Sequence, residues 1–169
     1  MIISMKLSKF SLFLGAYIII SAYFMNQVLN TWRITFGKNS IILSFILLSA
    51  WAMIATLYRS IKIKFNLIKI ALICGICAAG FIFAWKQPYL SEKAHVLEYG
   101  LLGWLAMRDL AAHKTAISKS VLYTLIFVAI IALLDEGFQG LLPWRVYEAR
   151  DIITNVLSGL LGTLLFIVK

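Results

Sequence analysis

Long stretches of the chain carry no charged residue and alternate with short segments where charges gather. Five such stretches span residues 10–32, 39–58, 70–85, 120–134 and 152–168, and a weaker sixth, 95–107, is interrupted by Glu98. A membrane-spanning helix needs about 20 mostly apolar residues. The pattern therefore predicts an all-α, polytopic membrane protein with about six transmembrane helices.

Composition supports this class and limits what else the chain can contain. Of 169 residues, 62% are hydrophobic and 14% are charged, whereas a soluble domain carries about 25% charged residues. Six spans use nearly the whole length, so we expect a single transmembrane domain over residues 1–169. A separate soluble catalytic domain, such as a Rossmann or P-loop nucleotide fold, is excluded.

The basic residues flank the apolar stretches instead of forming a patch with exposed aromatic residues, so nucleic acid is not an expected partner. If the amino terminus is cytoplasmic, ten of the 16 Lys and Arg residues fall inside and six outside. This excess predicts that both termini are cytoplasmic. Six of the seven acidic residues then share the outer side.

Some small and sulfur-containing residues have an expected packing role. Cys74 and Cys77 have a Cys-x-x-Cys spacing but lie in an apolar stretch without polar neighbours, which favours membrane packing over a redox or metal role. Gly159 and Gly162 are expected to permit close helix packing.

Most of the informative polar residues lie in two segments, 91–100 and 135–155, at predicted outer ends of spans. Helical spacing places Glu92, His95, Glu98 and Tyr99 on one face. The same reasoning pairs Asp135 with Gln139 and Asp151 with Asn155, each four positions apart. We therefore expect three helix ends to direct these groups toward one point at the outer leaflet.

The position of Glu98 gives this cluster an energetic requirement. A charged side chain near the middle of a span costs about 2.5–3.5 kcal/mol, so it needs a partner or a wet cavity. Lys93, Arg145 and Arg150 are the available cations. One interpretation is a self-neutralising network that only joins the helix ends. The other, which we favour, is a polar cleft that binds a lipid headgroup.

The residue types suggest roles within such a cleft. His95 can act as a general acid or base, with Glu98 orienting its ring. Asp135 and Glu136 are adjacent and point about 100° apart on a helix, so one can bind a ligand while the other caps or pairs. Arg145 suits an anionic headgroup. A divalent cation held by carboxylates remains an alternative, although no motif with fixed metal spacing is present, and the cofactor stays unassigned.

Two sequence blocks resemble the VanZ-like family of small bacterial membrane proteins, named after a protein linked to teicoplanin resistance. They are Glu-Lys-x-His-x-x-Glu-Tyr-Gly-Leu-Leu-Gly from Glu92 and Asp-Glu-x-x-Gln-x-x-x-Pro-x-Arg from Asp135, and the resemblance covers residues 88 to 166. Trp144 and Ser158 stand where members often have glycine. The matching positions are His95, Glu98, Tyr99, Asp135, Glu136, Gln139, Pro143, Arg145, Asp151 and Asn155.

The resemblance implies a multi-pass protein of the bacterial cytoplasmic membrane with an envelope role, but it supplies no reaction. We expect the cleft to bind or modify a lipid-linked cell-envelope intermediate, with an effect on glycopeptide sensitivity. The alternatives are a membrane scaffold with a purely structural polar network and, less favoured, a lipid transporter or flippase. Oligomeric state stays open. The catalytic candidates are His95, Glu98, Asp135 and Glu136, and the substrate-binding candidates are Tyr99, Gln139, Arg145, Asp151 and Asn155.

Overall fold

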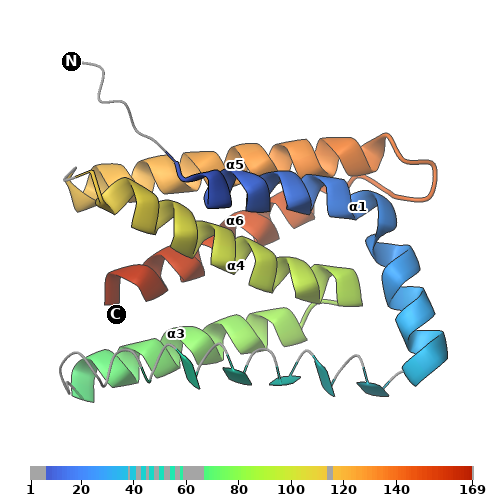
Figure 1. Ribbon diagram of the computed structural model, residues 1–169, viewed down its shortest axis with the longest axis horizontal. Helices are drawn as coiled ribbons and strands as arrows, with labels where there is room; N and C mark the ends of the chain where they lie inside the picture. Colours follow the sequence, from blue (N-terminus) through green and yellow to red (C-terminus); the bar gives the residue numbers. More distant parts are fainter. Residues whose placement is uncertain are drawn as a thin grey trace.

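The computed structural model describes residues 7–37, 67–113 and 116–168, together with eleven residues between 39 and 58. The helices are α1 (Lys9–Phe36), α3 (Leu67–Trp85), α4 (Leu90–Ala111), α5 (Ile117–Gly140) and α6 (Ala149–Val168) (Figure 1). Four of them, α1, α3, α5 and α6, are long and apolar enough to cross a membrane. The all-α, membrane-compatible class is therefore confirmed.

Five of the six predicted spans fall within these helices, each extended by a few residues at one or both ends. The remaining one, 39–58, lies partly outside the described residues, so the number of six spans and the cytoplasmic termini stay predictions. The two polar segments are mostly helical: 91–100 belongs to α4, and only 141–148 separates α5 from α6. Thus their polar side chains lie on regular helix faces.

The helices alternate in direction. In Figure 1, α1, α3 and α5 run one way, and α4 and α6 run the other way. The beginnings of α4 and α6 therefore meet the end of α5. The second part of α1 turns away from α5 in the same view.

Helix α4 is the central helix and contacts α1, α3, α5 and α6. Its Tyr99 and Leu102 pack with Ile18 of α1 and Val128 of α5 in the main apolar core. The surrounding helices instead expose apolar side chains such as Phe13. This arrangement explains why α4 is the most polar of the helices, because its neighbours shield it from lipid.

Glycines bring α4 and α6 into backbone contact, as predicted for Gly159 and Gly162. A Cβ atom added at Gly162 would overlap the carbonyl of Gly100, and one added at Gly103 would overlap the carbonyl of Gly159. Next to this contact, the Ser158 hydroxyl is buried and donates to the Thr154 carbonyl at 2.7 Å. The structure therefore accommodates a serine at position 158, next to this close backbone contact.

The two cysteines lie on α3 as half-buried free thiols. No contact described for them indicates chemistry, and their expected packing role stays a prediction.

Candidate functional site

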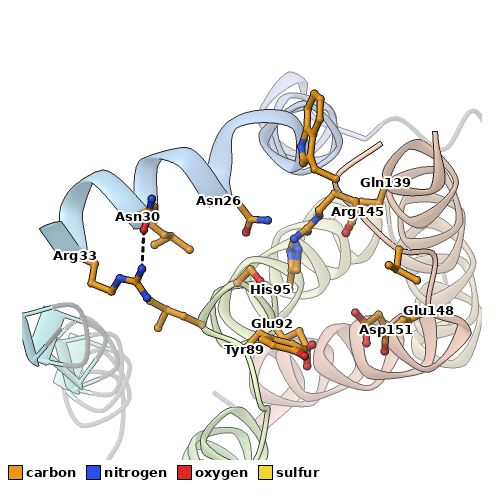
Figure 2. Close-up of a pocket in the computed structure, with 15 residues that line it drawn as sticks. Asn26, Asn30, Arg33, Tyr89, Glu92, His95, Gln139, Arg145, Glu148 and Asp151 are labelled. Carbon is orange, nitrogen blue, oxygen red and sulfur yellow. Dashed lines mark hydrogen bonds between the residues drawn. The ribbon is translucent and has the colours of Figure 1, made fainter. Parts of the chain in front are cut away.

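A cavity of about 440 Å³ opens at the end of the bundle where α4 and α6 begin and α5 ends. Side chains from α1, α4, α5, α6 and the loop 141–148 line it (Figure 2). The polar lining residues used below are Asn26, Asn30, Arg33, Glu92, His95, Gln139, Arg145, Glu148 and Asp151.

The loop 141–148 is held over this cavity by contacts at both of its ends. Its first residues continue from α5 in tight turns, because Leu142 N–H donates to the Gln139 carbonyl at 3.0 Å and Arg145 N–H donates to the Leu142 carbonyl at 3.1 Å. Trp144 then packs edge-on against Tyr23 of α1, with ring centroids 5.5 Å apart. These contacts fix the backbone that carries Arg145.

Glu136 fastens the far end of the same loop. It is 1% exposed, and its Oε2 accepts a hydrogen bond from the Glu148 backbone N–H at 3.1 Å. Its neighbour Asp135 instead accepts from the Tyr99 hydroxyl at 3.1 Å. The two adjacent carboxylates thus have different partners, and neither is among the residues that line the cavity.

His95 and Glu98 form a pair on α4, with 3.0 Å between Nδ1 and Oε2. Only His95 lines the cavity. The ion-pair partner of Glu98 is therefore His95, one helical turn away, and not one of the three available cations, Lys93, Arg145 and Arg150. Lys93 points back to α3, where its Nζ donates to the carbonyls of Trp85 at 2.8 Å and Ala84 at 3.3 Å.

One wall of the cavity is acidic. Glu92 and Asp151 lie in the first turns of α4 and α6, where the partial positive charge of a helix N-terminus favours carboxylates. Arg150 contacts Glu92 and Glu148 at 3.3 Å and Asp151 at 3.5 Å. Since its side chain is 54% exposed, these contacts are solvent-screened and weak.

Two arginines also line the cavity, Arg33 on the side away from Glu148 and Asp151, and Arg145 nearer the middle (Figure 2). Arg33 donates to Asn30 Oδ1 at 2.8 Å, and Arg145 reaches into the middle of the cavity toward His95 (Figure 2). Within the described part of the chain, neither arginine forms an ion pair with an acid. Both guanidinium groups are therefore available to an anion.

Buried polar atoms without a hydrogen bond gather in the same region. They are Asp135 Oδ1, Gln139 Nε2, Arg145 Nε, Asp151 Oδ1 and Asn155 Nδ2. An unsatisfied buried polar group costs about 1–3 kcal/mol, so such atoms need water or a ligand. All five atoms belong to residues that were predicted from the sequence as site candidates.

The sequence-predicted residues therefore occupy two layers. His95, Gln139, Arg145 and Asp151 line the cavity. The others lie outside its lining, and most of them support it: Glu98 holds His95, and Glu136 holds the loop. This supporting or surrounding set is Glu98, Tyr99, Asp135, Glu136 and Asn155. Among the described residues, no group of three His, Cys, Asp or Glu side chains is arranged to hold a metal ion.

Sequence reasoning missed the contribution of α1. Asn26, Asn30 and Arg33 line the cavity and follow the i, i+4, i+7 spacing of one helix face. The signal that could have found these residues is present in the sequence, as a polar helix face at the end of the apolar stretch 10–32. Glu148 also lines the cavity but was not among the site candidates. Glu92 was placed on the correct helix face but was given no catalytic or binding role.

Comparison with known proteins supports and extends the resemblance. The family model described as VanZ/LLP1 matches residues 10–169, so the similarity includes α1 and α3 as well as the two polar blocks. No curated protein and no solved structure matches the chain.

Proposed function

This chain belongs to the VanZ/LLP1 family, and we propose that its polar cavity binds the phosphate-bearing headgroup of a lipid or lipid-linked envelope intermediate. The observation that carries the proposal is Arg145, which lines the cavity and whose Nε is buried without a partner. A guanidinium group with free donors suits the oxygen atoms of a phosphate. Gln139 Nε2 is a second unpartnered donor in the lining.

A membrane lipid fits this position better than a soluble anion. The cavity lies at the ends of helices that are long and apolar enough to cross a membrane. Val146, which lines the cavity, and Ile153, near the start of α6, are exposed apolar side chains. A headgroup in the cavity would leave its acyl chains against such surfaces. We place this end at the outer leaflet of the bacterial cytoplasmic membrane.

An enzyme acting on the same headgroup is the second candidate, and the His95–Glu98 pair favours it. His95 faces the cavity, and Glu98 at 3.0 Å would orient its ring and stabilise its protonated form. In this version Arg145 holds the phosphate while His95 transfers a proton. His95→Gln would then abolish turnover while leaving lipid binding within about twofold.

The envelope role would follow from the identity of the lipid. If it is a cell-wall precursor, occupancy of the cavity would change how much precursor is accessible at the surface, and sensitivity to glycopeptides such as teicoplanin would change with it. A purely structural polar network would give neither lipid dependence nor a change in sensitivity.

Lipid carried through purification tests the binding proposal. We expect native mass spectrometry of the purified protein to show a bound phosphate-containing lipid. Arg145→Gln should weaken its binding roughly tenfold to hundredfold, because hydrogen bonds to charged groups contribute about 1.5–3 kcal/mol.

Lys86→Gln is the matched control, since Lys86 is an exposed cation outside the cavity lining. Equal lipid retention by the Arg145 and Lys86 variants, both folded, would contradict the proposal.

A further inference from the structure

The cavity lining holds charges of both signs at separate places, and this arrangement limits which headgroups fit. Arg33 and Arg145 lie among the lining residues together with the carboxylates of Glu92, Glu148 and Asp151. Figure 2 shows Glu148 and Asp151 on one side of the cavity and Arg33 on the other, with His95 and Arg145 between them. A simple anion would use only the arginines.

Arg150 does not neutralise the acidic wall. One guanidinium group is shared by three carboxylates at 3.3–3.5 Å, which leaves an excess of two negative charges when all three are ionised. Arg150 Nε lies 3.5 Å from Asp151 Oδ1, and this buried oxygen has that ion-pair contact but no hydrogen bond. The wall therefore has acceptors for a second cation.

This wall belongs to a built site and is not an exposed acidic patch. Glu92 is 7% exposed, and Gln139 is 4% exposed. Both line the cavity, and Gln139 Nε2 has no partner there. Gln139 supplies a buried donor atom without a hydrogen bond, and Asp151 supplies a buried acceptor atom without one in the same cavity lining. The two together indicate a ligand that carries both acceptors and donors.

We propose that the cavity binds a zwitterionic headgroup, with the phosphate against Arg145 and Gln139 and a primary ammonium against Glu92 and Asp151. This inference rests on the proposed function and specifies its ligand class. A primary ammonium has three N–H donors for carboxylate oxygens, whereas a quaternary ammonium group has no N–H to donate. The volume of about 440 Å³ is within the range of small-molecule sites, about 300–1,000 Å³, and accommodates both groups.

Lipids that differ only in the headgroup test this assignment. The full-length protein would be mixed with phosphatidylethanolamine, phosphatidylglycerol or phosphatidylcholine of identical acyl chains, and binding would be measured by native mass spectrometry. We expect phosphatidylethanolamine to bind roughly tenfold more tightly than the other two. Equal binding of phosphatidylethanolamine and either of the other lipids would overturn the primary-ammonium assignment.

Variants separate the two ends of the headgroup. Asp151→Asn, alone and combined with Glu92→Gln, should remove the preference for phosphatidylethanolamine while phosphatidylglycerol still binds. Arg145→Gln should weaken both lipids, and Lys86→Gln should change neither. A preference that survives in the folded Asp151→Asn and double variants would overturn the inference.

The outcomes distinguish this inference from the proposed function. Arg145-dependent binding of all three lipids to the same extent overturns the inference and leaves the proposed function standing. No binding of any lipid overturns the proposed function. Competition by free phosphoethanolamine, with inorganic phosphate as the weaker competitor, supports the zwitterionic assignment. If free phosphoethanolamine binds but the lipid does not, the zwitterionic headgroup chemistry is supported. The proposal that the ligand is a membrane lipid is then overturned.

Discussion

Helix α4 carries a buried acid near each end, and the two surroundings differ sharply. Asp109 lies 17 positions after Glu92, which corresponds to about 25 Å along a helix. Glu92 lines the cavity, where its only described side-chain hydrogen bonds come from Arg150 at 3.3–3.4 Å. Asp109 lies where α4 ends and α1 begins, away from the cavity.

Asp109 is fully paired by protein groups. Its Oδ2 accepts from the Ser8 backbone N–H at 2.9 Å and from the Ser11 hydroxyl at 2.5 Å. Its Oδ1 accepts from Arg108 Nη2 at 2.9 Å and Nε at 3.1 Å. We call this group, Ser8, Ser11, Arg108 and Asp109, the serine–aspartate clasp.

The difference shows that a buried charge does not by itself indicate a functional site. The serine–aspartate clasp joins two helix ends, and each oxygen of its carboxylate has a donor. The cavity end instead leaves five buried polar atoms without a hydrogen bond. Incomplete pairing, more than burial or charge, is what separates the candidate site from the structural cluster.

Removing the central acid of the clasp should give the largest effect on stability. Asp109→Ala leaves the Ser8 N–H, the Ser11 hydroxyl and Arg108 without their acceptor, so we expect a loss of about 3 kcal/mol in the free energy of unfolding. Denaturant unfolding in detergent would measure it.

Asp109→Asn is the milder comparison, because it keeps one carbonyl acceptor and should lose less. Folded Asp109→Ala protein should still bind lipid with wild-type affinity. Loss of binding in that fraction would mean that the two ends are coupled.

Replacing the Gln139 amide, which lines the cavity, should change the free energy of unfolding less than Asp109→Ala does, and should not lower it. Gln139→Leu removes a buried donor that has no partner, so without lipid we expect unchanged stability or a gain of up to about 1 kcal/mol. Lipid binding should weaken severalfold in the same variant.

Ser11→Ala removes a buried donor from the serine–aspartate clasp. It should destabilise the protein by about 1 kcal/mol, because the Ser11 hydroxyl donates a hydrogen bond to Asp109. If both variants lose stability equally, the contrast between the two ends is wrong.

The smallest effect is expected for the cysteines. Replacing Cys74 and Cys77 together by serine should change the free energy of unfolding by less than about 1 kcal/mol, since both are only half-buried. Lipid binding should not change. A folded double variant without lipid binding would show that the pair has a functional role.

The helices were predictable because each contains a run of apolar residues, and the face that groups Glu92 with His95 follows from helical spacing. Partners from distant segments were not predictable in this way. Asp109 is held by Ser8 and Ser11, about a hundred positions earlier in the chain. Spacing places a residue on a face but does not say which helix covers that face, so the clasp and the role of Lys93 at the end of α3 were missed.

The glycine contact between α4 and α6 fixes the spacing of the two helices whose first turns carry Glu92 and Asp151 into the cavity. With carbonyl groups packed where side chains would otherwise stand, these two helices have no compressible layer between them. A larger ligand therefore cannot gain room by separating them. Any adaptation of the cavity to the size of its contents must therefore come from the other lining segments, the loop 141–148 and the second part of α1.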